Sequence, residues 1–383
     1  MPPPILQFGT SRFLQAHVDL FVCEAARRDP GAALGKITVV QTTAHAASSA
    51  RIAALREHRR YPVHIRGMQH HETVDLRIES DSIAEALHAD EDWSLLRERI
   101  RHDVKVIVSN TGDSGYAVFA EDHAALLEGN TAPRGFAAKL AVLLHTRYRD
   151  GAEAITLLPC ELVSRNGDVL RDLVVDIAQK WHAAPDFIAY LRDTCVWVNS
   201  LVDRIVSEPI TPVGAVAEPY ALWAIERQAG MVLPCRHDSM ILTDDLAHFE
   251  RLKLFLLNLG HTVLAQCWLD AQQAADAHLA DATVRDAMHH ATWRATLESV
   301  WANEVLPVFA ALGQGEQASR YLVEVRDRFD NPFLAHRLAD IATHHEQKKQ
   351  RRFKPIIDLA DELGVNIAHR YLRAALRDRI VKA

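Results

Sequence analysis

Three polar side chains interrupt the apolar stretch KLFLLNLGHTVLA, which begins at Lys253; they are Lys253, Asn258 and His261. On an α-helix, Asn258 lies about 140° and His261 about 80° around from Lys253, so all three share one side. Burial removes water from a lysine, lowers the pKa of its ammonium group and lets it accept and return a hydroxyl proton. The spacing therefore predicts acid–base chemistry on an alcohol or a ketone.

Each of the three residues also has an ordinary structural explanation when it is taken alone. Lys253 fits a solvated helix start, Asn258 a contact with a neighbouring loop, and His261 a core histidine. We favour the functional interpretation because buried polar groups cluster at sites. No histidines or cysteines have the spacing of metal ligands, so we expect a metal-free reaction. We interpret the adjacent histidines as surface residues; these are the pairs at 70–71, 289–290 and 344–345.

The N-terminal stretch has the order of a dinucleotide-binding unit. An apolar strand expected at 5–8 runs into a polar turn and a helix, where doubly wound folds bind a pyrophosphate. Only Gly9 of the G-x-G-x-x-G pattern is present, and a plain turn capped by Ser11 would look the same. The candidate cofactor contacts here and after the next strands are Phe8, Gly9, Thr10, Ser11, Phe13, Gln41, Asn110 and Thr111.

The second expected strand, residues 36–43, bears on the choice of cofactor. Sites for NAD usually offer an acidic residue after this strand to the ribose hydroxyls, whereas this sequence has Gln41-Thr42-Thr43. Arg51 could approach a 2′-phosphate, although an exposed helical arginine is more often simply solvated. The residues alone therefore leave both NAD and NADP open.

Later strand ends carry further candidates for substrate contact. Glu161 follows a strand expected at 154–158, at an edge where α/β sheets bind ligands. Asn199 lies at the end of the last expected strand and could donate its amide to a carbonyl oxygen. Arg204 is a candidate partner for a substrate carboxylate, although we favour a pairing with Asp203 that holds the domain junction together.

The elements that must position these residues are of two kinds. Up to about residue 206, β-rich runs alternate with amphipathic helical stretches, which is typical of a parallel sheet covered by helices. A hairpin is expected within 61–78, and helical periodicity takes over from about Pro209. We predict an α/β chain with a Rossmann-like doubly wound sheet in 1–206 and an all-helical substrate and catalytic domain in 207–383, sharing a cleft.

Composition limits the classes of partner and location. The 383 residues carry a formal charge of −7, which disfavours nucleic acid as a partner. No apolar run approaches the roughly 18 residues that span a bilayer, and the N-terminus does not read as a signal peptide. Five widely spaced cysteines without a C-x-x-C pair argue against disulfides and structural zinc. We expect a cytoplasmic protein with reduced thiols and no membrane partner.

The chain resembles the polyol-specific long-chain dehydrogenases and reductases, which include mannitol dehydrogenase. The resemblance covers nearly the whole chain and is carried by QFGTSRFLQAH, VSNTGDSGY, LPCELVSRNGD, NSLVDRI, EPYALWAIE, KLFLLNLGH and RFDNPFLAH. It implies a metal-independent, mostly NAD-linked enzyme in which Lys253 is the general base. It further implies that Asn258 and Asn199 polarise the reacting oxygen and that His261 binds substrate.

Within this family, the run from Pro159 to Trp181 and the pattern N-P-x-x-x-H followed by Lys348 most resemble the tagaturonate reductases, also called altronate oxidoreductases. That likeness implies a sugar acid or polyol as substrate, with His336 and Lys348 as candidates for binding its carboxylate. The chain's length is closer to that of mannitol-1-phosphate 5-dehydrogenase, so a sugar phosphate stays open. A non-catalytic NAD-binding protein is a third interpretation, and the sequence does not predict the oligomeric state.

Overall fold

The computed structural model describes residues 2–43, 46–112, 115–273 and 281–377. The chain forms two compact units that are discontinuous in sequence. Unit 1 holds residues 1–65 and 76–246, and unit 2 holds residues 66–75 and 247–383. The main division thus lies at residue 246, later than the predicted position at 206.

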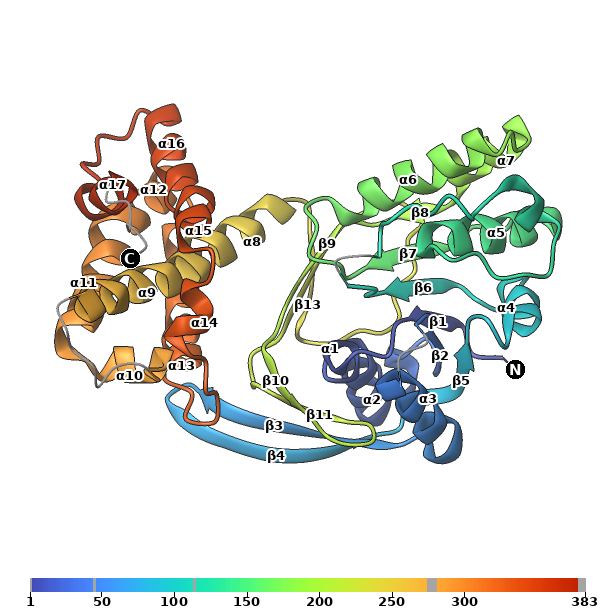
Figure 1. Ribbon diagram of the computed structural model, residues 1–383, viewed down its shortest axis with the longest axis horizontal. Coiled ribbons are helices and arrows are strands. Elements are labelled where there is room, and N and C mark those ends of the chain that lie inside the picture. The colour runs from blue at the N-terminus through green and yellow to red at the C-terminus, as the bar shows by residue number, and fades with distance from the viewer. Residues whose placement is uncertain (1, 44–45, 113–114, 274–280, 378–383) are drawn as a thin grey trace. The chain divides into compact units, whose positions relative to one another are not determined.

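A six-stranded parallel sheet forms the centre of unit 1, in the order β5-β2-β1-β6-β7-β8 (Figure 1). Its strands are β1 (Ile5–Phe8), β2 (Ile37–Gln41), β5 (Ile83–His88), β6 (Val106–Ser109), β7 (Thr156–Pro159) and β8 (Val196–Trp197). The strand order reverses at β1, which has β2 on one side and β6 on the other. In doubly wound sheets, the carboxyl ends of the strands at such a reversal are where ligands bind. The predicted Rossmann-like sheet is therefore confirmed.

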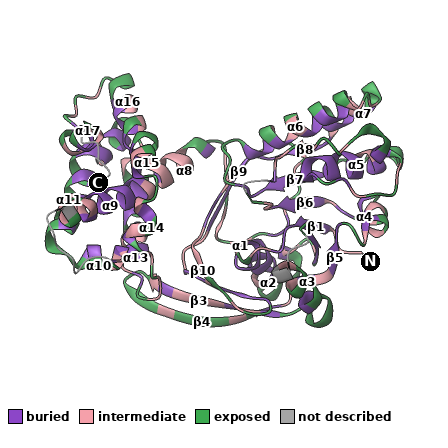
Figure 2. Cartoon of the chain, in the orientation of Figure 1, coloured by how far each residue is buried: buried purple, intermediate pink, exposed green. Residues whose placement is uncertain are grey.

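Helices cover this sheet and supply its core. They are α1 (Arg12–Gln15), α2 (Val18–Arg28), α3 (Ala46–His58), α4 (Trp93–Ile100), α5 (Phe136–Arg149), α6 (Asn166–Lys180) and α7 (Pro185–Ala189). Apolar side chains of α4, α5 and α6 pack with those of β1, β6 and β7 in one buried cluster. Figure 2 shows these strands buried along their length, as expected for a parallel sheet with both faces covered.

Further strands form outside the central sheet, and the last of them lie beyond the predicted end of the sheet domain at residue 206. The additional strands are β3 (Tyr61–Gln69), β4 (Glu72–Ser80), β9 (Ser200–Asp203), β10 (Val206–Pro209), β11 (Ala215–Ala217), β12 (Leu222–Glu226) and β13 (Met240–Thr243). They form a four-stranded sheet, β10-β11-β3-β4, and a three-stranded sheet, β13-β12-β9. The prediction that strands fade after residue 209 was wrong, because segments this short between prolines and glycines carry little periodic signal.

Unit 2 is helical apart from the tip of the β3–β4 hairpin. Its helices are α8 (Leu246–Leu252), α9 (Leu259–Gln273), α10 (Val284–His289), α11 (Ala291–Val300), α12 (Leu306–Ala311), α13 (Gly315–Phe329), α14 (Leu338–Ala342), α15 (His345–Arg352), α16 (Lys354–Glu362) and α17 (Arg370–Arg377). Two π-helical turns join successive helices, η4 (Lys253–Asn258) and η6 (Trp301–Val305). The span Leu246–Gln272 has the length and apolarity to cross a membrane, but 78% of its most apolar window is buried, as in a core helix. The predicted helical domain is confirmed.

A buried acidic group lies in the first βα region of unit 1. The Tyr61 hydroxyl donates a hydrogen bond of 2.7 Å to the Asp19 carboxyl group. Burial raises the pKa of Asp19 to about 7 and also raises the pKa of Tyr61. The folded state therefore favours the neutral carboxyl group, whereas the unfolded chain ionises it near pH 4.

Replacing Asp19 by Asn should change how the free energy of unfolding depends on pH. The contribution of Asp19 is complete below about pH 4, falls as the pH rises towards 7, and then stays constant. The stability of the wild type relative to Asp19→Asn should therefore drop by about 2 kcal/mol between pH 5 and pH 8. Urea denaturation at both pH values measures this difference, and an unchanged difference would contradict the assignment.

Candidate active site

Gly9 sets the geometry of the first strand-to-helix turn in unit 1. Its φ of +110° lies in a region that side chains disfavour, and a Cβ atom would come within 2.6 Å of the Asn110 carbonyl oxygen. The Gly9 amide donates to the Val40 carbonyl, while the Ser11 hydroxyl accepts from the Leu14 amide at 3.3 Å. Glycine thus lets the turn after β1 approach the turn after β6, where the predicted cofactor residues gather.

Side chains from the turn after β1, from the end of β2 and from α3 meet here. The Thr10 hydroxyl forms a short hydrogen bond with the Gln41 side-chain oxygen. Gln41 donates its amide to the Thr43 carbonyl at 3.0 Å and hydroxyl at 2.6 Å. A guanidinium nitrogen of Arg51 donates to the Thr10 hydroxyl at 3.4 Å. The turn and the end of β2 therefore form one polar corner, as the sequence predicts for a dinucleotide site.

Glu161 organises the loop after β6. One of its carboxyl oxygens accepts from the Thr111 amide and hydroxyl, each at 3.0 Å. The other accepts from the Ser109 hydroxyl at 3.0 Å and from the Tyr116 hydroxyl at 3.4 Å. Burial, followed by the charge of Glu161, raises the pKa of Tyr116. With four donors on its carboxylate, Glu161 anchors the loop after β6, and the predicted substrate contact stays a prediction.

The side chains of Asn199 and Arg204 also donate hydrogen bonds to other residues of unit 1. Asn199 accepts from the Asp168 amide at 3.0 Å and donates to the carboxylates of Asp168 and Glu226 at 3.1 and 2.7 Å. Arg204 donates from three nitrogens to the carbonyl oxygens of Ala16 and Glu218. Burial lowers the pKa of Arg204 to about 10. Both side chains therefore fasten neighbouring segments, and the amide predicted to face a substrate carbonyl already donates to two carboxylates.

The triplet of unit 2 lies on a widened helical turn. Lys253 to Asn258 form the π-helical turn η4, in which backbone hydrogen bonds join residues five apart. Lys253 and Asn258 are separated by five residues, so this turn brings them into line rather than 140° apart. His261 follows Asn258 by three residues at the start of α9, which makes the two neighbours on one side. The backbone therefore places the three residues in a row along one side of the helix.

Side chains from distant segments hold the widened turn. The indole nitrogen of Trp301 donates to the Leu256 carbonyl at 3.2 Å. The Asn258 carbonyl accepts from the Thr262 hydroxyl at 3.0 Å and from the Arg352 guanidinium at 3.1 Å. These donors add to the backbone hydrogen bonds of the turn, in which the Leu256 carbonyl also accepts from the Leu259 amide. Trp301 and Arg352 thereby tie the turn to two other helical segments.

Half-buried cations lie close to His261. The ring of His336 is 4.7 Å from that of His261, which also stacks on Phe329 at 4.3 Å. Burial lowers the pKa of His336; the charges of Lys348 and Arg352 act in the same direction, opposed by Asp340. Burial also lowers the pKa of Lys348 and Arg352.

Lys348 and Arg352 are four residues apart on α15 and so lie on one face of it. Lys348 donates to the Ile341 carbonyl at 2.7 Å, and Arg352 donates to the Asn258 carbonyl and the Thr262 hydroxyl. Within the described residues, neither forms a salt bridge with a carboxylate. The pair is therefore suited to an anionic group. Arg352 was missed in the sequence, although its spacing from Lys348 was a usable signal.

No group of potential metal ligands occurs among the described residues, and none of the five cysteines forms a disulfide.

His345 corrects one sequence interpretation, because it is buried and bonds to the Gln266 side chain at 3.0 Å rather than lying at the surface. Burial lowers its pKa to about 4.

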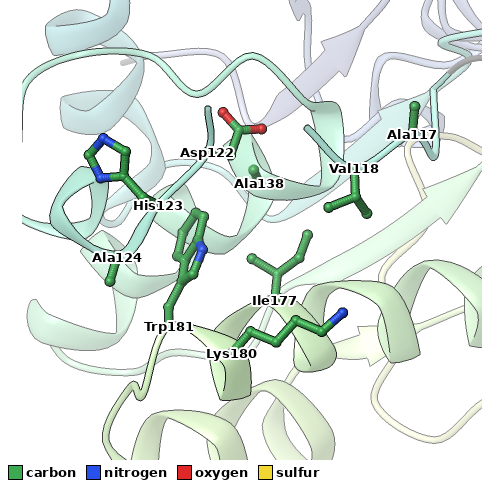
Figure 3. A pocket seen from close by; sticks show the side chains of 9 residues that line it. All are labelled: Ala117, Val118, Asp122, His123, Ala124, Ala138, Ile177, Lys180 and Trp181. Carbon is green, nitrogen blue, oxygen red and sulfur yellow. The ribbon is translucent and has the colours of Figure 1, made fainter. Parts of the chain in front are cut away.

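A pocket of about 320 Å³ opens in unit 1 between α5, α6 and the segment 117–124 (Figure 3). The indole ring of Trp181 and the side chains of Val118 and Ile177 give it a largely apolar lining. Asp122 lines it too, but its oxygens already accept the amides of the two residues at 134–135. None of the candidate site residues lines this pocket, and we assign the chemistry to the polar clusters instead.

Comparison with known proteins gives matches along the whole chain. A model of the mannitol dehydrogenase Rossmann domain matches residues 3–232, and a model of the mannitol dehydrogenase C-terminal domain matches residues 245–377. Altronate oxidoreductases of Halalkalibacterium halodurans and Bacillus subtilis are each 28% identical to this chain. The matches cover 93% and 95% of this chain, and 70% and 76% of those proteins.

Two solved structures share the fold. D-sorbitol dehydrogenase in substrate-free form superposes with a TM-score of 0.82 at 19% identity, over 98% of this chain and 80% of that one. Pseudomonas fluorescens mannitol 2-dehydrogenase, in a ternary complex with NAD and D-mannitol, gives 0.73 at 18% identity, over 98% and 78%. Because each alignment covers 98% of this chain, the shared fold includes both the α/β sheet domain and the helical domain.

Replacing Gly260 by Ala should damage the widened turn. A Cβ atom there would lie 2.8 Å from the Trp301 ring and 3.2 Å from the Phe329 ring, so both must shift. We expect the free energy of unfolding to fall by about 1–3 kcal/mol, as for other overpacked cores. Chemical denaturation measures this loss. In the control Gly315→Ala, the nearest atom is 3.4 Å away, and stability should hold or rise; equal effects would contradict the packing argument.

Proposed function

This chain belongs to the mannitol dehydrogenase family of oxidoreductases, and we propose that it interconverts a secondary alcohol and a ketone on a sugar acid. The proposed substrate pair is of the tagaturonate and altronate type, with NAD(P) as hydride carrier and Lys253 as general acid and base. The row formed by Lys253, Asn258 and His261 on the widened turn carries this proposal. We also propose that the protein is cytoplasmic and that its partner is a small molecule.

The residues of unit 1 fit a nicotinamide dinucleotide. Gly9 brings the backbone of the β1 turn close to the β6 turn, as a pyrophosphate site requires. Thr10, Gln41 and Arg51 offer polar groups at the end of β2, where the adenosine ribose of such cofactors binds. When bound, the dinucleotide supplies a hydride to the substrate or accepts one from it.

In the proposed mechanism, Lys253 of unit 2 transfers the proton. During reduction, the Lys253 ammonium group donates a proton to the carbonyl oxygen as the hydride reaches the carbonyl carbon. The lysine is left neutral and recovers a proton from solvent, and oxidation runs in reverse. The side-chain amide of Asn258 donates to the same oxygen and stabilises the charge that develops on it. His261 binds a substrate hydroxyl.

The cations on α15 support an acidic substrate. Lys348 and Arg352 act electrostatically on His336, which adjoins His261, and neither has a carboxylate partner among the residues described. A carboxylate or a phosphate would offset two half-buried positive charges, whereas a neutral polyol would not. The altronate oxidoreductases at 28% identity favour the carboxylate.

Replacing Lys253 by Ala should abolish most of the turnover. General acid–base catalysis contributes about 10²–10⁴-fold, so kcat should fall by that factor while NADH binding is retained. Steady-state NADH oxidation and fluorescence titration with NADH measure the two quantities. Lys354→Ala, on an exposed lysine of the same unit, is the control and should leave kcat unchanged. Turnover within twofold of the wild type would rule out the role of Lys253.

A substrate panel tests the acidic group. Tagaturonate, fructuronate, fructose 6-phosphate and fructose should be compared by NADH oxidation, and the ketouronates should have the highest kcat/KM. Lys348→Met should raise KM for the ketouronates about tenfold, the value of one charge-assisted hydrogen bond, and leave fructose unaffected. A preference for fructose 6-phosphate would favour a sugar-phosphate dehydrogenase instead. Cofactor binding without turnover of any ketose would favour a non-catalytic NAD-binding protein.

A further inference from the structure

The polar corner beside the β1 turn holds a cation, Arg51, that pairs with no carboxylate in the part of the chain that the structure describes. Arg51, on α3, donates one hydrogen bond of 3.4 Å to the Thr10 hydroxyl. No carboxylate of the described residues forms a salt bridge with its guanidinium group. Burial lowers the pKa of Arg51, and no neighbouring charge raises it. A half-buried arginine in this setting gains free energy from an anionic ligand.

The described residues at the end of β2 carry no negative charge that would repel such an anion. Its last residue is Gln41, and the following residues, Thr42 and Thr43, are neutral too. An acidic residue at this position hydrogen-bonds the ribose 2′-hydroxyl and repels a phosphate there, whereas a nearby arginine accommodates a 2′-phosphate. Gln41 turns its amide to Thr43, and Thr10 links Gln41 to Arg51. The cation and the neutral strand end therefore belong to one cluster.

We propose that Arg51, with Thr10 and Gln41, forms a subsite for the 2′-phosphate of NADP(H), and that this enzyme binds NADP(H) more tightly than NAD(H). The inference rests on the proposed function, because it specifies which form of the dinucleotide the protein takes. Two nitrogens of the planar guanidinium can bond two phosphate oxygens at once, a geometry that a ribose hydroxyl does not offer.

Calorimetric titration with 5′-AMP and 2′,5′-ADP isolates the contribution of the 2′-phosphate, since the two ligands differ only in that group. The full chain should bind 2′,5′-ADP about tenfold more tightly or better, as for one or two charge-assisted hydrogen bonds. NADPH should show the same advantage over NADH by fluorescence titration. This readout does not depend on turnover.

Arg51→Ala should remove the advantage of 2′,5′-ADP while 5′-AMP binding stays within twofold. Arg51→Gln removes the charge but keeps an unbranched stem and an amide donor, and it should have the same effect if Ala disturbs α3. The matched control is Arg60→Ala, an exposed arginine just beyond that helix, which should keep the preference.

Two outcomes would overturn the inference, and they can be told apart. Equal binding of 5′-AMP and 2′,5′-ADP, or a preference that survives both Arg51 variants, would exclude the phosphate subsite and leave an NAD-linked enzyme. Failure of NADH and NADPH alike to bind would remove the proposed function as well.

Discussion

The widened turn at Lys253–Asn258 is the constraint on which the candidate catalytic geometry depends. A regular α-helix would rotate residues five apart well away from each other, whereas a π-helical turn aligns them. Side chains from other segments also donate to the carbonyl groups of this turn. Trp301 and Arg352 do so from helical segments that are distant in sequence. The contacts that pack the helical unit therefore also place its candidate catalytic residues.

Much of the fold was predictable because its signals are local. The strand Ile5–Phe8 is an unbroken buried apolar run, and the long helix that contains Val263 and Leu264 is apolar over many turns. The triplet stood out for the same reason, since polar residues are conspicuous in apolar surroundings. The π-helical form of the turn was not predictable, because it depends on donors that only the folded chain brings to Leu256 and Asn258.

The type of a polar residue at a strand end did not show whether its side chain is already hydrogen-bonded within the protein. Glu161 and Asn199 have the chemistry of ligand-binding groups, and their positions follow strands of the sheet as expected. In the structure their hydrogen bonds go to Thr111 and to Asp168 and Glu226. Those partners are 27 to 50 residues away along the chain, so a sequence pattern does not show whether a polar group is engaged. Arg352 shows the converse, because its spacing from Lys348 was the only sequence signal and its contacts with Asn258 and Thr262 are visible only in the fold.

The path of the chain has a consequence for how the protein can be divided. Residues 66–75 form the tip of the β3–β4 hairpin and belong to unit 2, whereas the rest of both strands belongs to unit 1. At this tip the Asn331 amide donates to the Arg66 carbonyl, and Asp327 accepts from the His71 amide. A cut at residue 246 would strip the helical unit of ten residues and leave them as a loose end on the other fragment. A fragment that begins or ends at residue 246 would therefore contain one incomplete unit. Neither unit is encoded as one uninterrupted segment of the chain.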